Sequence, residues 1–199
     1  KLSSNENPYP PLPSVVEAVT GAVSSINLYP EIAAEELRGA IASRWEVSPD
    51  NIALGAGSVE VASQIILAVS NPGDQVMFAW RSFEAYPLLA TTAGAEPQPI
   101  ALTGEGGHDL PAMAAAVTPK TRVIFLCNPN NPTGTVLKAA AVDSFISSVP
   151  EDVLIVLDEA YVHFTRDADT AVGIEMFRKY PNVAVLHTFS KAYGLAGLR

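Results

Sequence analysis

The chain has 199 residues, a length that suits one large domain or two small ones. Hydrophobic residues make up 48% of it and charged residues 17%, which permits a sizeable core and excludes a largely disordered chain. The net charge of −9 and the lack of any basic run exclude a nucleic-acid surface, and no apolar stretch approaches the roughly 20 residues of a membrane span.

The single cysteine, Cys127, excludes an internal disulfide and fits a reducing compartment. No secretory signal is visible, so the sequence favours a cytoplasmic protein. The sequence lacks an initiator methionine and stops directly after a motif, and we expect both ends of the chain to be incomplete.

Helix and strand patterns alternate along the chain, which predicts an α/β domain with a largely parallel sheet. Residues 1–11 should form an extended arm, because their three prolines disfavour a helix. The expected helices are 13–26, 31–45, 59–71, 84–92, 109–117 and 138–148. The expected strands are a short one at 51–54 and apolar runs at 75–80, 122–127, 153–158 and 183–188.

Continuous apolar runs are typical of strands buried on both faces of a parallel sheet. In such sheets, ligands bind at the carboxyl ends of the strands. The residues directly after each run are therefore the candidates for function.

The first short strand runs into "GAGS" (55–58), which opens a helix. Glycines let the backbone approach a ligand closely, and a helix N-terminus favours an anion such as phosphate. The alternative is a tight turn with Ser58 as the helix N-cap.

The second strand is followed by "RSFEAYP" (81–87), in which Phe83 or Tyr86 could stack on a flat ring. The alternative, which is the more common one for a single aromatic residue, is that it belongs to the core.

The third strand is followed by "CNPNNPTGT" (127–135), whose prolines, asparagines and glycine indicate a rigid, irregular loop. Such a loop can hold one asparagine amide in a fixed direction. The alternative is a connecting loop without a ligand.

The fourth strand ends in "LDEAY" (157–161), which places Asp158 after an apolar run. A buried carboxylate is costly unless it is paired or hydrogen-bonded, and a bound cationic ring would pair it. A surface Asp that caps a helix is the alternative. A nucleotide site of the P-loop type is excluded, because G-x-x-x-x-G-K-[ST] is absent.

The fifth strand leads into "HTFSKAYGLAGLR" (187–199), with Lys191 among small residues. A lysine amine in a desolvated or cationic site can form a Schiff base with an aldehyde. Taken together, the five strand ends describe a phosphate, a flat ring, a cationic ring nitrogen and an aldehyde. That combination predicts pyridoxal 5′-phosphate as the cofactor.

The motifs "CNPNNPTG", "LDEAY" and "TFSKAYGLAGLR" resemble those of fold-type I aminotransferases that use pyridoxal phosphate. With "LSSNENP" (2–8) and "YPE" (29–31), they are most similar to the histidinol-phosphate and aromatic amino acid aminotransferase branch. The resemblance covers nearly the whole chain. It implies the three-layer large domain of that family, with a mostly parallel central sheet.

The resemblance implies a role for each motif residue. Lys191 would bind the cofactor covalently and later carry a proton to and from the substrate α-carbon. Asp158 would pair with the ring nitrogen, while Tyr161 and Asn131 would hydrogen-bond the ring oxygen and Phe83 would stack on the ring.

The same resemblance assigns the phosphate group to Gly57, Ser58, Thr188, Ser190 and Arg199. Tyr29 would reach the phosphate of a neighbouring subunit, which implies a homodimer with shared active sites. Asn7 would lie on the arm that lines the substrate pocket. No metal ion is implied.

For the domain organisation, we expect an arm and first helix at 1–30 and a cofactor-binding large domain at 31–199. The family's small C-terminal domain, with the arginine for the substrate carboxylate, would lie outside these 199 residues.

The implied reaction is ping-pong transamination between phenylalanine or tyrosine and 2-oxoglutarate. Histidinol phosphate is the alternative amino donor. More distant alternatives are a lyase or decarboxylase on the same fold, and a sensor domain of that fold without catalysis.

Overall fold

The computed structural model describes residues 3–198. The chain divides into two compact units, one of residues 58–188 and one of residues 1–57 together with 189–199. The expected division into 1–30 and 31–199 stays a prediction. No helix among the described residues is long and apolar enough to cross a membrane.

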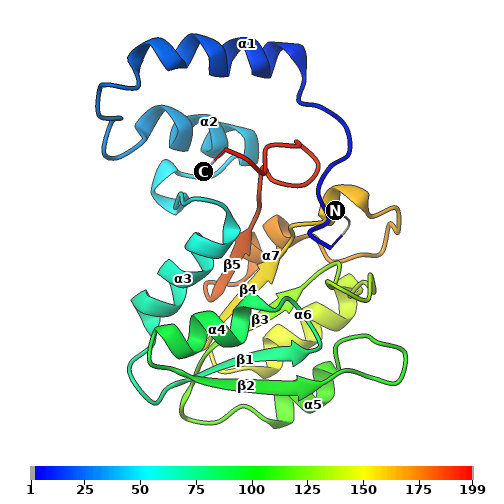
Figure 1. The fold of residues 1–199 in the computed structure, drawn as a ribbon. Coiled ribbons are helices and arrows are strands. Elements are labelled where there is room, and N and C mark those ends of the chain that lie inside the picture. Colours follow the sequence, from blue (N-terminus) through cyan, green and yellow to red (C-terminus); the bar gives the residue numbers. More distant parts are fainter. Residues whose placement is uncertain (1–2, 199) are drawn as a thin grey trace. The chain divides into compact units, whose positions relative to one another are not determined.

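A five-stranded parallel sheet organises residues 58–188 (Figure 1). Its strands are β1 (Gln75–Trp80), β2 (Glu96–Ala101), β3 (Thr121–Cys127), β4 (Leu154–Asp158) and β5 (Val183–Leu186). They lie in the order β2-β1-β3-β4-β5. The predicted α/β fold with a parallel sheet is therefore confirmed.

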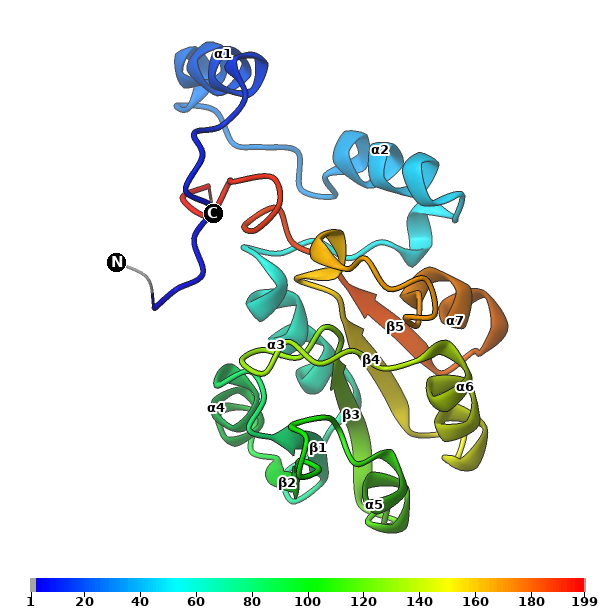
Figure 2. The same cartoon turned by 90° about the vertical axis from the view of Figure 1, so that its right-hand side faces the viewer.

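Helices cover both faces of this sheet, as Figure 2 shows. On one face lie α3 (Ser58–Val69) and α4 (Ala85–Thr92), and on the other lie α5 (Leu110–Ala115), α6 (Ala139–Ser148) and α7 (Gly173–Lys179). A short 3-10 helix, η3 (Val162–Phe164), follows β4. The predicted three-layer arrangement is confirmed.

Successive side chains of the central strand β3 point to opposite faces of the sheet, and they contribute to two separate layers of hydrophobic core. Val123 and Phe125 pack with α3 and α4, whereas Ile124 and Leu126 pack with α5 and α6. Successive side chains of a strand point to opposite faces, so a strand covered on both sides must be apolar throughout.

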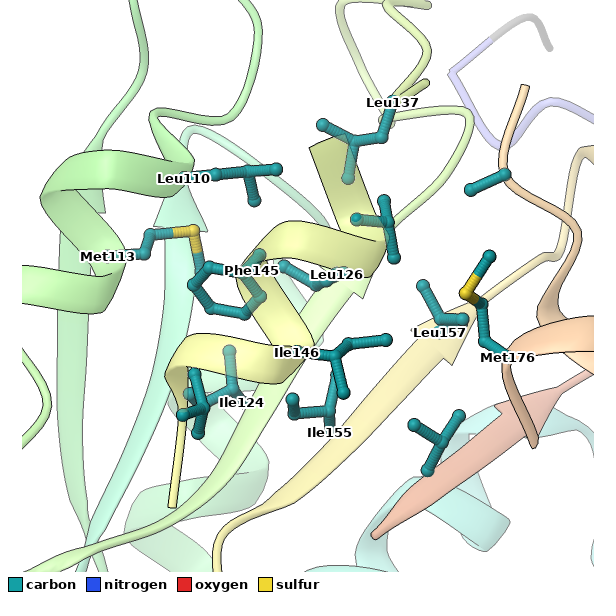
Figure 3. Packing of buried hydrophobic residues seen from close by; sticks show 14 of the residues in the cluster. Leu110, Met113, Ile124, Leu126, Leu137, Phe145, Ile146, Ile155, Leu157 and Met176 are labelled. Carbon is teal, nitrogen blue, oxygen red and sulfur yellow. The ribbon is translucent and has the colours of Figure 1, made fainter. Parts of the chain in front are cut away.

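The core between the sheet and α5, α6 and α7 is shown in Figure 3. Phe145 and Ile146 of α6 pack there with Ile124 and Ile155 of the sheet, and all four are at most 3% exposed. Truncating a buried phenylalanine to alanine costs about 3–5 kcal/mol. This core holds the strands, and therefore their carboxyl ends, in a fixed arrangement.

Three expectations about the elements need correction. Strand β2 was not expected, because its sequence EPQPIA contains Pro97 and Pro99. Prolines are tolerated on an edge strand, and β2 is at the sheet edge, paired only with β1 among the described strands. Helix α7 was also not expected, since seven residues show little periodicity. The strand expected at 51–54 is wrong, because residues 52–55 have no regular structure.

The other unit contains α1 (Pro13–Ala22), η1 (Val23–Ser25), α2 (Glu35–Trp45) and η2 (Pro49–Asn51). The helix expected at 13–26 is found as α1 with η1. Helix α2 starts later than expected, after Ala34 with its positive φ of 47°, and its first turn carries Glu35 and Glu36. Acidic residues there complement the helix dipole.

Candidate active site

Asp158 is the last residue of β4 and is only 3% exposed. Its Oδ2 accepts a hydrogen bond of 2.7 Å from the Tyr86 hydroxyl, and its Oδ1 accepts one of 3.2 Å from the Ala160 amide. Burial raises the pKa of the Asp158 carboxyl, while these two hydrogen bonds oppose the rise. Within residues 58–188, no lysine or arginine forms an ion pair with Asp158.

Tyr86 belongs to the core and not to a ligand-facing surface. Its side chain is 1% exposed and stacks on Phe125, with ring centroids 4.5 Å apart and an interplanar angle of 15°. Burial, followed by the Asp158 charge, raises the pKa of Tyr86 far above its usual value, so the hydroxyl keeps its proton and donates a hydrogen bond to Asp158.

Phe83 is half-buried and meets Tyr86 edge to face, with centroids 5.5 Å apart. Tyr86 therefore lies between Phe83 and Asp158 and contacts both. Since the faces of Tyr86 are used in the core, Phe83 is the better candidate for stacking on a flat ring; that role stays a prediction.

The loop after β3 carries Asn131, which is half-buried, and its neighbour Asn130, which is 3% exposed. Tyr161 lies three residues after Asp158, at the start of η3, and is half-buried. Both predicted ligands of the ring oxygen thus follow strands, β3 and β4, that are neighbours in the sheet.

Glu159 follows Asp158 and is also only 3% exposed. Its Oε1 accepts the Gly173 amide at 2.6 Å, and its Oε2 lies 2.6 Å from Nε2 of His187. The Glu159 amide donates to the Leu186 carbonyl at 2.9 Å. Glu159 therefore connects the ends of β4 and β5 with the start of α7. Its partner His187 directly precedes Thr188, a predicted phosphate ligand.

The predicted phosphate ligands come from two segments of the chain, one at the start of α3 and one after β5. Gly57 has a φ of +82°, a backbone conformation that residues with a side chain rarely adopt. Ser58 is the first residue of the twelve-residue helix α3. Thr188 is half-buried, and Ser190 is 7% exposed. Arg199 lies outside the described residues.

Lys191 is half-buried, and its Nζ donates to the carbonyls of Ser4 and Asn5 at 3.0 and 3.3 Å. The amide of Asn7 donates to the carbonyls of Lys191 and Ala192, both at 3.2 Å. The structure thus brings Asn7 and Lys191 together. Tyr29 is fully exposed.

Cys127, the last residue of β3, is 2% exposed. Burial, with a smaller contribution from the Asp158 charge, raises the pKa of its thiol to about 12, so it stays protonated and is a poor nucleophile. Residues 3–198 contain no cluster of His, Cys, Asp and Glu that could hold a metal ion.

Sequence patterns did not single out Ser82, His108, Asn130, Glu159 or His187, all of which hydrogen-bond at the strand ends. Two of them directly precede predicted ligands, Ser82 before Phe83 and Asn130 before Asn131. Their position next to a predicted ligand, in a loop at a strand end, was the available signal.

Comparison with known proteins gives consistent matches. The family described as aminotransferase class I and II matches residues 1–199. A protein of Cutibacterium acnes named aromatic amino acid aminotransferase is 58% identical over the whole chain, which covers 56% of that protein. A protein of Streptomyces coelicolor with the same name is 57% identical, with 55% covered. The chain thus spans about half the length of these curated relatives.

Among solved structures, the histidinol-phosphate aminotransferase of Sinorhizobium meliloti in complex with pyridoxal 5′-phosphate has a TM-score of 0.90 and 33% identity. The match covers 98% of this chain and 53% of that one.

Proposed function

Because this chain belongs to the class I and II aminotransferase family, we propose that the full-length protein transfers an amino group from an aromatic amino acid to a 2-oxo acid. Pyridoxal 5′-phosphate is the proposed cofactor. The observation that carries the proposal is Asp158, a buried carboxylate at a strand end with no cationic side chain paired to it within residues 58–188.

The donor set at Asp158 fits a protonated ring nitrogen. Ionising this carboxyl is costly because burial raises its pKa, and a positive charge beside it would remove that cost. Each oxygen accepts one hydrogen bond from the protein, so a lone pair is left for a further donor. Asp158 would hold the proton on the ring nitrogen.

When bound, the cofactor supplies an electron sink that stabilises negative charge at the substrate α-carbon. Lys191 would hold its aldehyde carbon and, once released by substrate, move a proton at the α-carbon. Phe83 would lie on the ring face, while Asn131 and Tyr161 would donate to or accept from the ring oxygen.

The phosphate group would be bound at the start of α3. The positive φ of Gly57 lets the backbone approach closely, and the amides of a helix N-terminus favour an anion. Thr188, Ser190 and Arg199 would complete the site from the segment after β5, with Arg199 binding two oxygens.

The proposed amino donor is phenylalanine or tyrosine. The relatives named aromatic amino acid aminotransferase support it, at 57% and 58% identity. Histidinol phosphate is the second candidate, supported by the structural neighbour of that name at 33% identity.

The donor is tested by the visible absorption of the full-length protein loaded with pyridoxal phosphate. We expect the band of the lysine-bound cofactor to disappear on adding phenylalanine and to persist with histidinol phosphate. If the band disappeared with histidinol phosphate and not with phenylalanine, histidinol phosphate would be the amino donor. A protein that never acquires the band contradicts the cofactor itself.

Lys191→Ala tests the covalent link in the same full-length protein. We expect this variant to lose turnover and the mass increase that borohydride reduction fixes in the wild type. Lys120→Ala, at an exposed lysine, is the matched control and should behave as wild type. Normal turnover in Lys191→Ala would refute the assignment.

The proposed assembly is a homodimer in which Tyr29 reaches the phosphate of the other subunit. The full exposure of Tyr29 supports this, as does its setting among the exposed side chains of Ile26, Leu28 and Ile32. Mixing Lys191→Ala with Tyr29→Ala protomers should restore activity, because each hybrid dimer holds one unaltered site. Mixtures as inactive as their parents, with hybrids shown by mass spectrometry, would contradict shared sites.

A further inference from the structure

Loops that follow three neighbouring strands meet at one buried side chain, Asn130. Its Oδ1 accepts the Ser82 hydroxyl at 2.7 Å and faces Nε2 of His108 at 3.2 Å. Its Nδ2 donates to the Arg81 carbonyl at 3.3 Å and to Oγ1 of Thr133 at 2.8 Å. The Asn130 amide thus makes all four of its possible side-chain hydrogen bonds.

The direction of each hydrogen bond follows from its partners. The Arg81 carbonyl can only accept, so the Asn130 nitrogen faces it and the oxygen faces Ser82 and His108. Because that oxygen can only accept, Nε2 of His108 carries the proton. Nδ1 of His108 is then an acceptor, and it is buried with no hydrogen-bond partner among the described residues.

The network extends to the loop after β2. Oγ1 of Thr133 donates to the Gly106 carbonyl at 2.8 Å, and Thr135 donates to the same carbonyl at 3.1 Å. His108 is held to Leu102, directly after β2, by an antiparallel bridge. The loops after β2, β1 and β3 are therefore joined through one amide.

We propose that Ser82, Asn130 and His108 are positioning residues that set the placement of Phe83 and Asn131 against the cofactor ring. This inference rests on the proposed function. Phe83 and Asn131 are each bonded covalently to a member of the network, so a shift of Ser82 or Asn130 moves them directly.

Burial gives the network its rigidity. Ser82, Asn130 and His108 are 1%, 3% and 7% exposed, so water cannot replace their hydrogen bonds. Leaving a buried polar group unsatisfied costs about 1–3 kcal/mol, which disfavours other loop conformations. A functional site needs its groups held within about 0.5 Å, and side chains locked by such bonds provide this.

The test compares two substitutions of His108 in the full-length protein. His108→Phe removes the donor to Asn130, whereas His108→Gln keeps an N–H donor at a similar reach. Amide hydrogen exchange of residues 81–84 and 128–135 is measured without cofactor, and the dissociation constant of pyridoxal phosphate is measured by absorbance.

We expect His108→Phe to speed exchange in both loops and to weaken cofactor binding about tenfold, with His108→Gln close to wild type. Unchanged exchange in His108→Phe would overturn the network, and faster exchange with wild-type affinity would overturn its positioning role. A wild type that binds no cofactor refutes the proposed function instead, and the exchange result still decides the network.

Ser82→Ala provides a milder variant should His108→Phe fail to fold. It removes one of the two bonds to the Asn130 oxygen, and we expect faster exchange in the same two loops with about threefold weaker binding. Ser144→Ala, the same change at an exposed position of α6, is the matched control. Equal behaviour of the two serine variants would overturn the proposal.

Discussion

The two halves of the sheet's carboxyl edge are built with different chemistry. Beyond β2, β1 and β3, the loops meet at the neutral amide of Asn130, whose hydrogen bonds are all satisfied. At the end of β4, which pairs with β5, two buried carboxylates, Asp158 and Glu159, are adjacent in the sequence. A neutral network fixes geometry at little electrostatic cost, whereas a buried carboxylate needs a donor or a positive charge.

The two carboxylates also differ from each other. Glu159 accepts one hydrogen bond on each oxygen, from Gly173 and from His187, and so it connects the ends of β4 and β5 to the start of α7. Asp158 also accepts one hydrogen bond on each oxygen, but its partners are the Tyr86 hydroxyl and the Ala160 amide, and burial raises the pKa of its carboxyl. Under the proposed function, Asp158 would serve the chemistry, whereas Glu159 holds the ends of the two strands.

The largest expected effect comes from making the charged half neutral. Asp158→Asn would remove the proposed partner of the ring nitrogen, and breaking a buried pair costs about 3–5 kcal/mol, which is roughly a hundredfold or more in cofactor affinity or rate. Single-turnover kinetics and cofactor titration measure it. A variant with wild-type values would show that Asp158 belongs with Glu159 as a structural group.

The same variant has an opposite effect on the cofactor-free protein. Because the folded state raises the pKa of Asp158, its contribution to stability is present at low pH and lost as pH rises through that pKa. Relative to wild type, Asp158→Asn should therefore become more stable as pH increases. Urea unfolding between pH 4 and about 8 measures the difference, and a difference independent of pH would contradict it.

The next effect tests how tightly the Glu159 contacts are packed. A Cβ at Gly173 would lie 2.8 Å from both Oε1 of Glu159 and Cγ1 of Val185, and Glu159 is held in place by His187. Gly173→Ala should destabilise by about 1–3 kcal/mol in urea unfolding.

Gly39→Ala is the matched control for this substitution. Gly39 lies inside helix α2, and apart from its own helix backbone a Cβ added there would meet no atom of residues 3–198 within 4 Å, so alanine should stabilise by about 0.5–1 kcal/mol. Equal changes in stability for the two variants would mean that the side chains around Glu159 can shift to accommodate the added methyl group.

A smaller effect is expected at the junction of the two halves. Tyr86 lies on α4 but donates to Asp158, and Tyr86→Phe removes a hydrogen bond to a charged group worth about 1.5 kcal/mol or more. The pKa of Asp158 should rise further, because Tyr86 is the main influence that lowers it against burial. Carbon NMR of labelled aspartate measures this pKa. If the pKa of Asp158 did not change, Tyr86 would contribute to core packing only.

The smallest expected effect concerns the neutral half. Burial lowers the pKa of His108, so its contribution to stability is complete above the unfolded value of about 6.5 and declines as pH falls below it. His108→Gln should remove that decline while keeping the network. Thermal unfolding at pH 5 and at about pH 7 measures it, and identical pH profiles for both proteins would contradict it.

Much of the fold was predictable because buried parallel strands are continuous apolar runs. Strands β1 and β3 fall within one residue of their expected bounds. The missed strand β2 has the sequence EPQPIA, where prolines and polar residues hide the pattern. The strand expected at 51–54 failed because a short apolar segment beside glycines can also be irregular.

The site divides in the same way. Asp158 was singled out because it directly follows an apolar run, and Lys191 because it lies in the segment that follows β5; their roles stay predictions. The pairs that hold the site were not visible, since Ser82 and Asn130 are 48 residues apart and Glu159 and His187 are 28 apart. Such contacts depend on which strands become neighbours in the sheet, and short stretches of sequence do not predict the strand order.

The edge strand β2 has a consequence for aggregation. The amides of Glu96 and Leu102 donate toward the β1 side, to Asp74 and Trp80, so the alternate positions 97, 99 and 101 face away from the sheet. Proline occupies the first two, and it has no amide hydrogen to offer. A further strand would therefore find few amide donors at this edge, which disfavours edge-to-edge pairing with another chain.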